Sequence, residues 1–517
     1  MRSIALAVML SVVPALAQPI LPQRFDDTIT INVVDVPVYV ERFGVPVRGL
    51  TRDDFTLFVD GKPHPIEYFD VIDEGVAAEA APDAPADLKR RRLIVLLFDL
   101  SASPYSLQRA REAAMKYVAE GVAGDTFAVA TVGRSDLRFI AAFTTDRVAV
   151  QRAIATLAPS ASRDPFRVAT LDDERARWAG TLGGAEAGLG AFSDIWGDDI
   201  APGGMGVSSA AENAAAFERT AQEMEALEEE SLSIGFVESL SALADRLAPL
   251  EGVKQVVLLS ERQSGRDGQG PVMQRTTRLH ARYRAAGVIL NAVDIHPPRV
   301  PSGAAISSTP DGRTRAQSAL ASEFLYSLAL DTGGVVTSSL PQLLERNRHA
   351  YVIGFRAPEG AARESIRVEV KNLPRLTDVR YRKSYDLRAA KSADQGLFLA
   401  DTLLNDIPQN GVTLGLAVKG TQVTASIPGV ELLSYASGRP LPLEVFFYVF
   451  NEEGRPFSWN VAQIAVDLEK GRDFLSAHPY TMRQDLVLQP GRYVVKALVR
   501  VAGTDRVGFQ RAPLVVQ

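Results

Sequence analysis

One short segment constrains the fold of this chain more than any other. Six consecutive apolar residues, 93–98, are followed by Asp99, Ser101 and Ser103. An apolar run of this length, bounded by turn-forming residues, is typical of a strand that is buried on both faces of a sheet. Ser103 and Pro104 are typical of the N-cap and the first residue of a helix. The segment therefore predicts a buried strand, then a turn that carries one carboxylate and two hydroxyls, and then a helix.

Strand-like and helix-like segments alternate after this point. Apolar runs at 127–132, 253–259 and 288–293 are separated by segments with helical periodicity, and a further run lies at 351–355. Such alternation favours a parallel sheet with helices on both faces. The fold class predicted for residues 91–390 is therefore α/β, with a doubly wound, mostly parallel sheet. Ligands bind such sheets at the carboxyl ends of the strands.

The segments on either side are richer in strand patterns. Residues 25–73 predict a small N-terminal β domain, in which Asp60-Gly61 is a strong hairpin signal. Residues 74–90 are rich in alanine and proline, which is typical of a linker. Residues 395–517 contain short strands separated by turns, which predicts an immunoglobulin-like β-sandwich.

The first residues indicate export. A basic residue, an apolar run at 4–13 and Ala15-Leu16-Ala17 predict a signal peptide over residues 1–17. No later apolar run reaches 18 residues, so we expect no transmembrane segment after cleavage. The chain contains no cysteine, so it has no disulfides, and we expect a bacterial protein that is periplasmic or secreted. The net charge of −6 argues against nucleic acid as a partner.

Four segments together resemble one family. Asp99–Ser103 resembles the metal-ion-dependent adhesion site of von Willebrand factor type A domains. Val47–Phe55, Leu328–Gly334 and Tyr351–Phe355 resemble segments of the bacterial branch of related proteins, in the order found there. The resemblance covers nearly all of residues 91–390, together with the β segment before it. It implies a type A domain that binds other proteins.

The resemblance also implies a set of metal ligands. Ser101 and Ser103 would offer hydroxyl oxygens to Mg²⁺, and Asp99 would act directly or through water. A threonine from a second loop completes the family pattern, and Thr170 is the first choice here, with Thr181 as the alternative. Magnesium prefers oxygen ligands and retains water. A protein partner could complete its coordination with a carboxylate.

Two features depart from the family pattern. The third loop of the family carries Asp-Gly, whereas this chain has Glu261-Arg262 after Ser260. Glu261 is then the expected third-loop ligand, although Arg262 could pair with it instead. Residues 159–230 form a long acidic insertion, which a minimal domain of this type lacks.

Motifs for covalent catalysis are missing from the sequence. It has no Gly-x-Ser-x-Gly, no His-Glu-x-x-His and no P-loop, and its five histidines are scattered singly. We therefore expect a secreted or periplasmic protein-binding module that acts through a divalent metal. We do not expect an enzyme. One alternative is a structural envelope component with a degenerate metal site. The other is a metal-dependent hydrolase, for which the sequence offers no general base.

Overall fold

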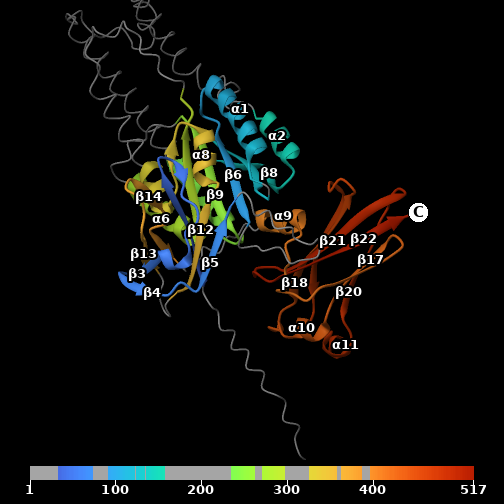
Figure 1. The fold of residues 1–517 in the computed structure, drawn as a ribbon. Coiled ribbons are helices and arrows are strands. Elements are labelled where there is room, and N and C mark those ends of the chain that lie inside the picture. Colours follow the sequence, from blue (N-terminus) through green and yellow to red (C-terminus); the bar gives the residue numbers. More distant parts are fainter. Residues whose placement is uncertain are drawn as a thin grey trace, which may run out of the picture.

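The computed structural model describes seven stretches of the chain (Figure 1). They are residues 33–73, 91–157 (without 123, 134 and 135), 234–261, 271–296, 325–357, 363–386 and 396–517. The predicted signal peptide 1–17, the linker 74–90 and the insertion 159–230 lie outside the described residues, as do Thr170, Thr181 and Arg262.

A sheet of six strands positions the loop after residue 99. Its strand order is β11-β10-β9-β6-β7-β8, and all neighbouring pairs are parallel except β7–β8. The strands are β6 (Arg92–Asp99), β7 (Thr126–Val132), β8 (Leu137–Thr144), β9 (Val253–Ser260), β10 (Val288–Asp294) and β11 (Val336–Thr337). β6 and β9 consist mainly of apolar residues, and both strands are buried along their whole length.

Helices cover this sheet on two sides. Side chains of β6 alternate between two cores, with Leu93, Val95 and Leu97 in one and Ile94, Leu96 and Phe98 in the other. The first core is completed by the helix 234–247, by α6 (Pro271–Ala286) and by the helix 325–332. The second is completed by α1 (Pro104–Glu120), α2 (Arg147–Ala155) and α8 (Leu340–Asn347).

The N-terminal strands do not form a separate domain. β1 (Val33–Arg42) pairs with β12 (Ala350–Arg356) and β14 (Thr377–Arg380), while β3 (Phe55–Val59) pairs with β13 (Arg363–Val370). The same two sheets also contain β2 (Val45–Pro46), β4 (Lys62–His64), β5 (Tyr68–Ile72) and β15 (Ser384–Asp386). A 3-10 helix, η1, spans Arg52–Asp54. Residues from the start of the chain and from 350–386 thus share two antiparallel sheets.

Two further antiparallel sheets enclose a core near the C-terminus. One holds β16 (Gly415–Lys419), β17 (Gln422–Ile427) and β20 (Tyr480–Asp485), and the other holds β18 (Leu441–Asn451), β19 (Pro456–Val466), β21 (Gly491–Val501) and β22 (Val507–Val516). Two short helices, α10 (Gly429–Leu433) and α11 (Arg472–Ala477), accompany them. The helix α9 (Gly396–Asn405) packs against this part and against β8.

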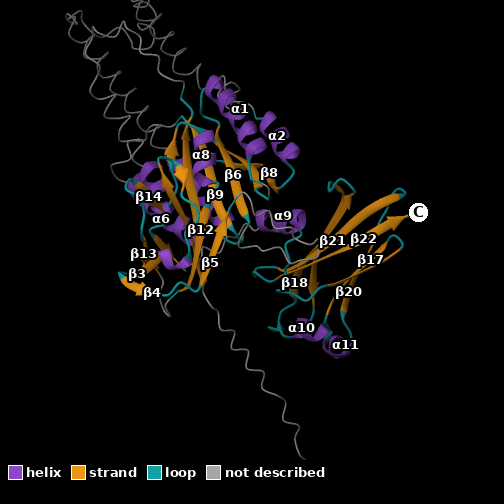
Figure 2. Cartoon of the chain, in the orientation of Figure 1, coloured by secondary structure: helices purple, strands orange, loops and turns teal. Residues whose placement is uncertain are grey.

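The predicted fold class is wrong for the chain as a whole. Strands dominate the described residues (Figure 2), and four of the five sheets described are antiparallel. The described residues form a mostly β structure and not a doubly wound α/β fold of the type A kind. The prediction failed because a local alternation of patterns does not reveal which distant strands pair. The prediction assigned the strands of 33–72 to a small domain of their own, whereas these strands pair with strands about 300 residues later in the chain.

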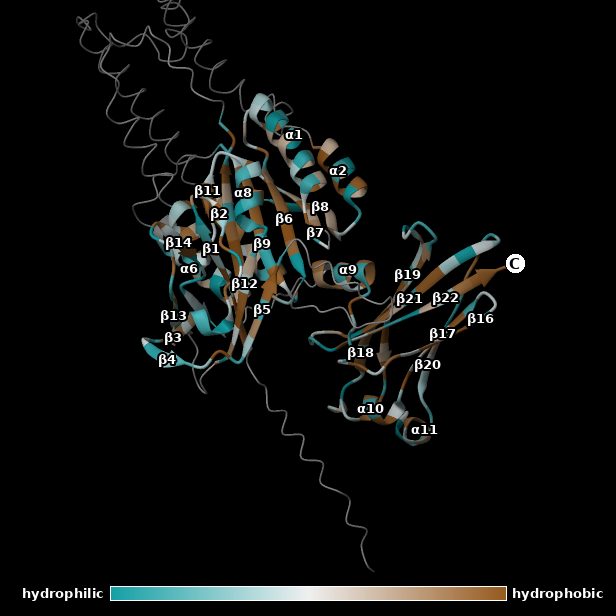
Figure 3. Ribbon diagram, in the orientation of Figure 1, coloured by the Kyte–Doolittle hydropathy of each residue, from teal (hydrophilic) through white to brown (hydrophobic). Residues whose placement is uncertain are grey.

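Two of the sequence segments singled out above meet in the structure. The Tyr351 hydroxyl donates a hydrogen bond to the Val47 carbonyl (2.9 Å) and accepts one from the Leu50 amide (3.1 Å). Tyr351 lies in β12 and is fully buried. Figure 3 shows the apolar character of the strands around this region. The two segments therefore hold the first part of the chain onto β12.

The segment Leu328–Gly334, which was also singled out in the sequence, ends a helix and packs against β10. The Thr332 hydroxyl donates to the Leu328 carbonyl (2.9 Å) and accepts from the Leu290 amide (3.0 Å). Gly333 adopts φ +82°, which favours glycine. A Cβ on Gly334 would lie 1.8 Å from the Leu290 carbonyl oxygen. Both glycines are therefore required by backbone geometry.

Candidate functional site

The loop after β6 is organised around a buried carboxylate. The Asp99 side chain is 0% exposed. Its Oδ1 accepts hydrogen bonds from the Ser101 amide (3.0 Å) and the Ser101 hydroxyl (2.5 Å). Its Oδ2 accepts one from the Ser260 hydroxyl (2.7 Å). Asp99 therefore joins its own turn to the end of the neighbouring strand.

A second carboxylate reaches the same loop from β9. The Ser103 amide donates to Glu261 Oε2 (2.6 Å), and the Ser103 hydroxyl donates to Glu261 Oε1 (2.8 Å). Ser103 is also the N-cap of α1, where its hydroxyl oxygen faces the Ser106 amide (3.4 Å). Glu261 thus lies at the amino end of a helix, where a negative charge is stabilised.

Strand register explains why these residues meet. Phe98 of β6 is opposite Leu259 of β9 in a parallel pair, so the next residue of each strand is Asp99 and Ser260. The chain continues from β6 through α1 to β7 on one side, whereas β9 lies on the other side. The two loops therefore diverge at the carboxyl ends of β6 and β9, which is where open parallel sheets bind ligands.

Four of the five predicted site residues come together here, namely Asp99, Ser101, Ser103 and Glu261. Thr170, the fifth, lies outside the described residues. Sequence analysis missed Ser260 as a member of the site. Its signal was its position, since it ends a predicted strand directly before Glu261.

Electrostatics keep Glu261 ionised near neutral pH. Burial raises the pKa of this carboxyl, but the Ser106 hydroxyl, the Ser103 amide and hydroxyl, and the charge of His296 together lower its pKa below the usual 4.5. His296 follows β10 and pairs with Asp294, whose Oδ1 lies 2.6 Å from His296 Nδ1.

The donor set suits a hard divalent cation. Two carboxylates and the hydroxyls of three serines converge, and all of these groups offer oxygen. Among the described residues, no group of three or more histidine, cysteine, aspartate or glutamate side chains forms a cluster that could hold a metal ion. Hydroxyls must therefore supply part of any coordination, and Asp99, Ser101, Ser103 and Glu261 would hold a bound Mg²⁺. A cation bound there would supply a positive centre that an acidic group of a partner could bind.

A groove lies beside these residues. It has a volume of about 330 Å³ and lies between α1, α8 and the ends of β9 and β10. Its α1 wall carries Arg109, Glu112 and Lys116, and its floor includes the apolar side chains of Leu259, Val293 and Ile295. Near the carboxyl ends of β9 and β10, the molecule therefore presents a concave surface with an apolar floor and a wall that carries both positive and negative side chains.

The comparisons with known proteins identify no family. No protein-family model and no curated protein matches the chain. Among solved structures, the chain is similar to the chicken interferon gamma receptor alpha chain, with 13% identity over 32% of this chain and 72% of the receptor chain, at a TM-score of 0.16. It is also similar to dimeric latent PorU from Porphyromonas gingivalis, with 14% identity over 32% of this chain and 14% of PorU, at a TM-score of 0.15. Scores this low carry no argument about fold or function.

Proposed function

We propose that this chain is an exported protein-binding module that recognises a protein partner through a divalent cation at the carboxyl ends of β6 and β9. One observation carries the proposal: the Asp99–Ser101–Ser103 turn is hydrogen-bonded to the Ser260–Glu261 turn at two places, Asp99 to Ser260 and Ser103 to Glu261. A partner carboxylate would complete the coordination of the cation. Among the described residues, no helix is both long and apolar enough to span a membrane.

The chemistry of the network supports this function. Both carboxylates accept hydrogen bonds from serine hydroxyl and amide groups of the turns after β6 and β9. Hydroxyl groups that donate to a carboxylate can rotate and offer a lone pair to a cation instead. Rotation of these serine side chains can therefore turn hydroxyl oxygens toward a cation. The Asp-x-Ser-x-Ser resemblance agrees with this chemistry.

A second candidate function rests on the same hydrogen bonds. Glu261 accepts from Ser103 with both of its oxygens, and Asp99 accepts three hydrogen bonds. These hydrogen bonds alone can hold the two loops together without a bound ion. The protein would then be a structural envelope component in which these residues hold the fold and bind no ion.

Capture from envelope extract separates the two candidates. The mature protein is immobilised and washed with Mg²⁺ or with a chelator, and the retained proteins are compared. The proposal predicts a partner that elutes with the chelator and is not captured by Ser101→Ala. Glu453→Gln is the matched control, because Glu453 is 65% exposed and, within the described stretches, pairs with a neighbouring surface arginine, Arg455. If the same proteins are retained after the chelator wash and by Ser101→Ala, the result would support the structural envelope component.

A further inference from the structure

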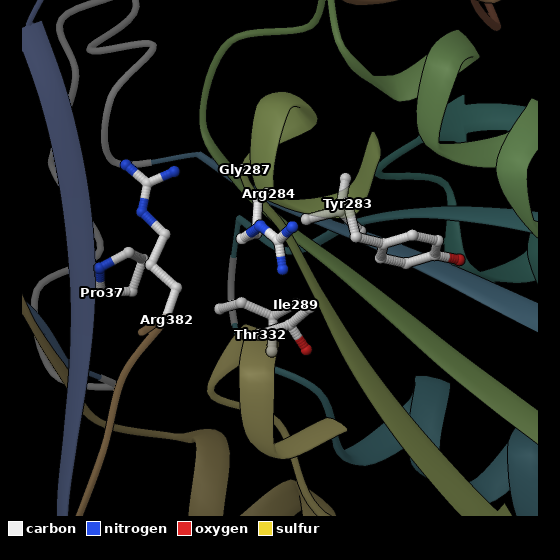
Figure 4. Close-up of a pocket in the computed structure, with 8 residues that line it drawn as sticks. Pro37, Tyr283, Arg284, Gly287, Ile289, Thr332 and Arg382 are labelled. Carbon is white, nitrogen blue, oxygen red and sulfur yellow. The ribbon is translucent and has the colours of Figure 1, made fainter. Parts of the chain in front are cut away.

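The enclosed cavity at the amino end of the six-stranded sheet has no room for a ligand larger than water. Its lining includes Arg284, near the end of α6, and Arg382, which follows β14 (Figure 4). The cavity admits the centre of a water-sized sphere over about 10 Å³, which is the space of one water molecule. The surface that remains without an assigned partner lies elsewhere, on the two sheets near the C-terminus.

β19 is an edge strand that is exposed on both of its faces. It pairs with β18 on one side, and no strand in the described part of the chain pairs with its other edge. Of its eleven residues, only Val466 is buried. Trp459 is 65% exposed and Val461 is 49% exposed. The strand therefore presents large apolar side chains together with an open backbone edge.

The other edge strands of these two sheets are protected against pairing. β16 and β20 carry exposed charged residues, namely Lys419, Arg483 and Asp485. β22 contains Arg511 and Pro513, and its Phe509 amide donates a hydrogen bond to the preceding segment. Charges, prolines and covering segments are the devices by which proteins keep edge strands from pairing. β19 has none of these charges, and its one proline is its first residue.

This uncharged strand is complementary to a second copy of itself. Val461 is the middle residue of β19, so an antiparallel pair centred on it would include all eleven residues of both strands. In that register Trp459 lies opposite Gln463 of the copy and diagonal to its Val461, within reach of an aromatic side chain. On β18, the half-buried Tyr448 and Phe446 lie opposite Trp459 and Val461 and extend the apolar surface.

The turns at the two ends of β19 allow this approach. In an antiparallel pair, the turn before β19 lies near the turn after β19 of the copy. The four carboxylates of these turns pair with basic residues of their own chain at 3.0–3.8 Å, namely Glu452 with Arg492, Glu453 with Arg455, Asp467 with Lys470 and Glu469 with Arg472. Repulsion between the turns of two copies is therefore small.

We propose that β19 pairs antiparallel with β19 of a second copy of this chain, so that two sheets of four strands join into one sheet of eight. The dimer has two-fold symmetry, and the same surface of each copy forms the interface. Burial of Trp459 and Val461 and the backbone hydrogen bonds of the two edges hold it together. The inference does not depend on cation binding after β6 and β9.

Sedimentation velocity of the intact mature protein tests this inference. We expect a dimer whose fraction rises with protein concentration. Val461→Lys should raise the dissociation constant of the dimer at least about tenfold, because two lysines would face each other. Val515→Lys is the matched control, because Val515 is 61% exposed on β22, the other edge of the same sheet. This control should form dimers as the wild type does, and thermal unfolding of both variants checks that they are folded.

Hydrogen exchange locates the contact without any variant. The amides of β19 should be protected at high protein concentration and exchange faster on dilution, whereas those of β22 should not change. A single chain at every concentration, or a dimer in which exchange of β19 does not depend on concentration, would overturn the inference. Protection of β19 that appears only after envelope extract is added would also overturn it, because the strand would then pair with a different protein.

Discussion

The two ends of the six-stranded sheet carry opposite charges and hold them in different ways. At the carboxyl end, Asp99 and Glu261 are surrounded by hydroxyl and amide donors from short turns. At the amino end, Arg92, Lys254 and Arg284 are buried, and their partners are the carboxylates of Asp125 and Asp331 and the backbone carbonyl of Leu250. The two ends differ in the type of partner: serine hydroxyls at the carboxyl end can reorient toward a ligand, whereas the carboxylates and backbone carbonyls at the amino end hold buried basic groups within the fold.

The largest effect should follow from breaking the ion pair at the amino end. Arg92 Nε lies 3.2 Å from Asp125 Oδ1, and the two side chains are 4% and 1% exposed. Asp125→Ala would leave the guanidinium buried and without a counter-charge, so we expect a loss of about 3–5 kcal/mol in the free energy of unfolding. Denaturant unfolding measures it. Arg92→Met combined with Asp125→Leu should recover much of the loss, and a double variant no more stable than Asp125→Ala would refute the explanation.

Lys254 should make stability depend on pH in the alkaline range. Its pKa is about 8 in the folded protein and 10.5 in the unfolded chain, so the unfolded state binds more protons between these values. The free energy of unfolding should therefore rise as pH increases from 8 toward 10.5, by at most about 3 kcal/mol. The measurement compares the pH dependence of the wild type with that of Lys254→Met, in which this rise should be missing. Parallel curves for the two proteins would contradict the account.

At the carboxyl end, Asp99→Asn should affect ligand binding more than folding. In the variant, the side-chain amide nitrogen would face a serine hydroxyl that now donates a hydrogen bond to Asp99. Loss of that hydrogen bond should lower the free energy of unfolding by about 1–3 kcal/mol. Because one negative charge is lost, we expect the affinity for Mn²⁺ to fall by at least about tenfold, equal to about 1.4 kcal/mol. Chemical unfolding and calorimetric titration give the two values. Unchanged Mn²⁺ affinity in a folded variant would count against the site.

The smallest effect should come from Glu261→Gln on acid stability. The pKa of Glu261 is lowered in the folded protein, so its contribution is present above 4.5 and is lost as pH falls through the lower, folded value. Because Glu261 is partly exposed, solvent screening should limit this contribution to well under about 1 kcal/mol. Acid unfolding of the wild type and the variant should converge below that range. If Glu261→Gln and the wild type lose stability equally over the whole acid range, the carboxylate is not stabilised by Ser103.

Local sequence predicted the local parts of the structure. Helix α1 begins at Pro104 with Ser103 as its N-cap, as the Ser-Pro pair indicates. The Asp60-Gly61 turn joins β3 to β4, with φ values of +51° and +76° at its two residues. These features depend on residues within a few positions of one another, so their pattern is visible in the sequence.

Features that depend on distant pairing could not be predicted. Nothing in residues 33–42 indicates that β12 and β14 are their partners, and the fold class was wrong for that reason. Ser260 was missed because its role comes from the register of β6 against β9, which the sequence does not specify. Likewise, Arg382 meets Arg284 only through the arrangement of three separate elements.

The most direct test of the account is a titration of the intact mature protein with Mn²⁺, followed by electron paramagnetic resonance of the free ion. We predict one bound ion per chain, displaced by excess Mg²⁺, lost in Ser101→Ala and retained in Glu453→Gln. An absence of binding at millimolar Mn²⁺, or binding that is equal in the wild type and Ser101→Ala, would contradict the claim that the turns after β6 and β9 form a cation site.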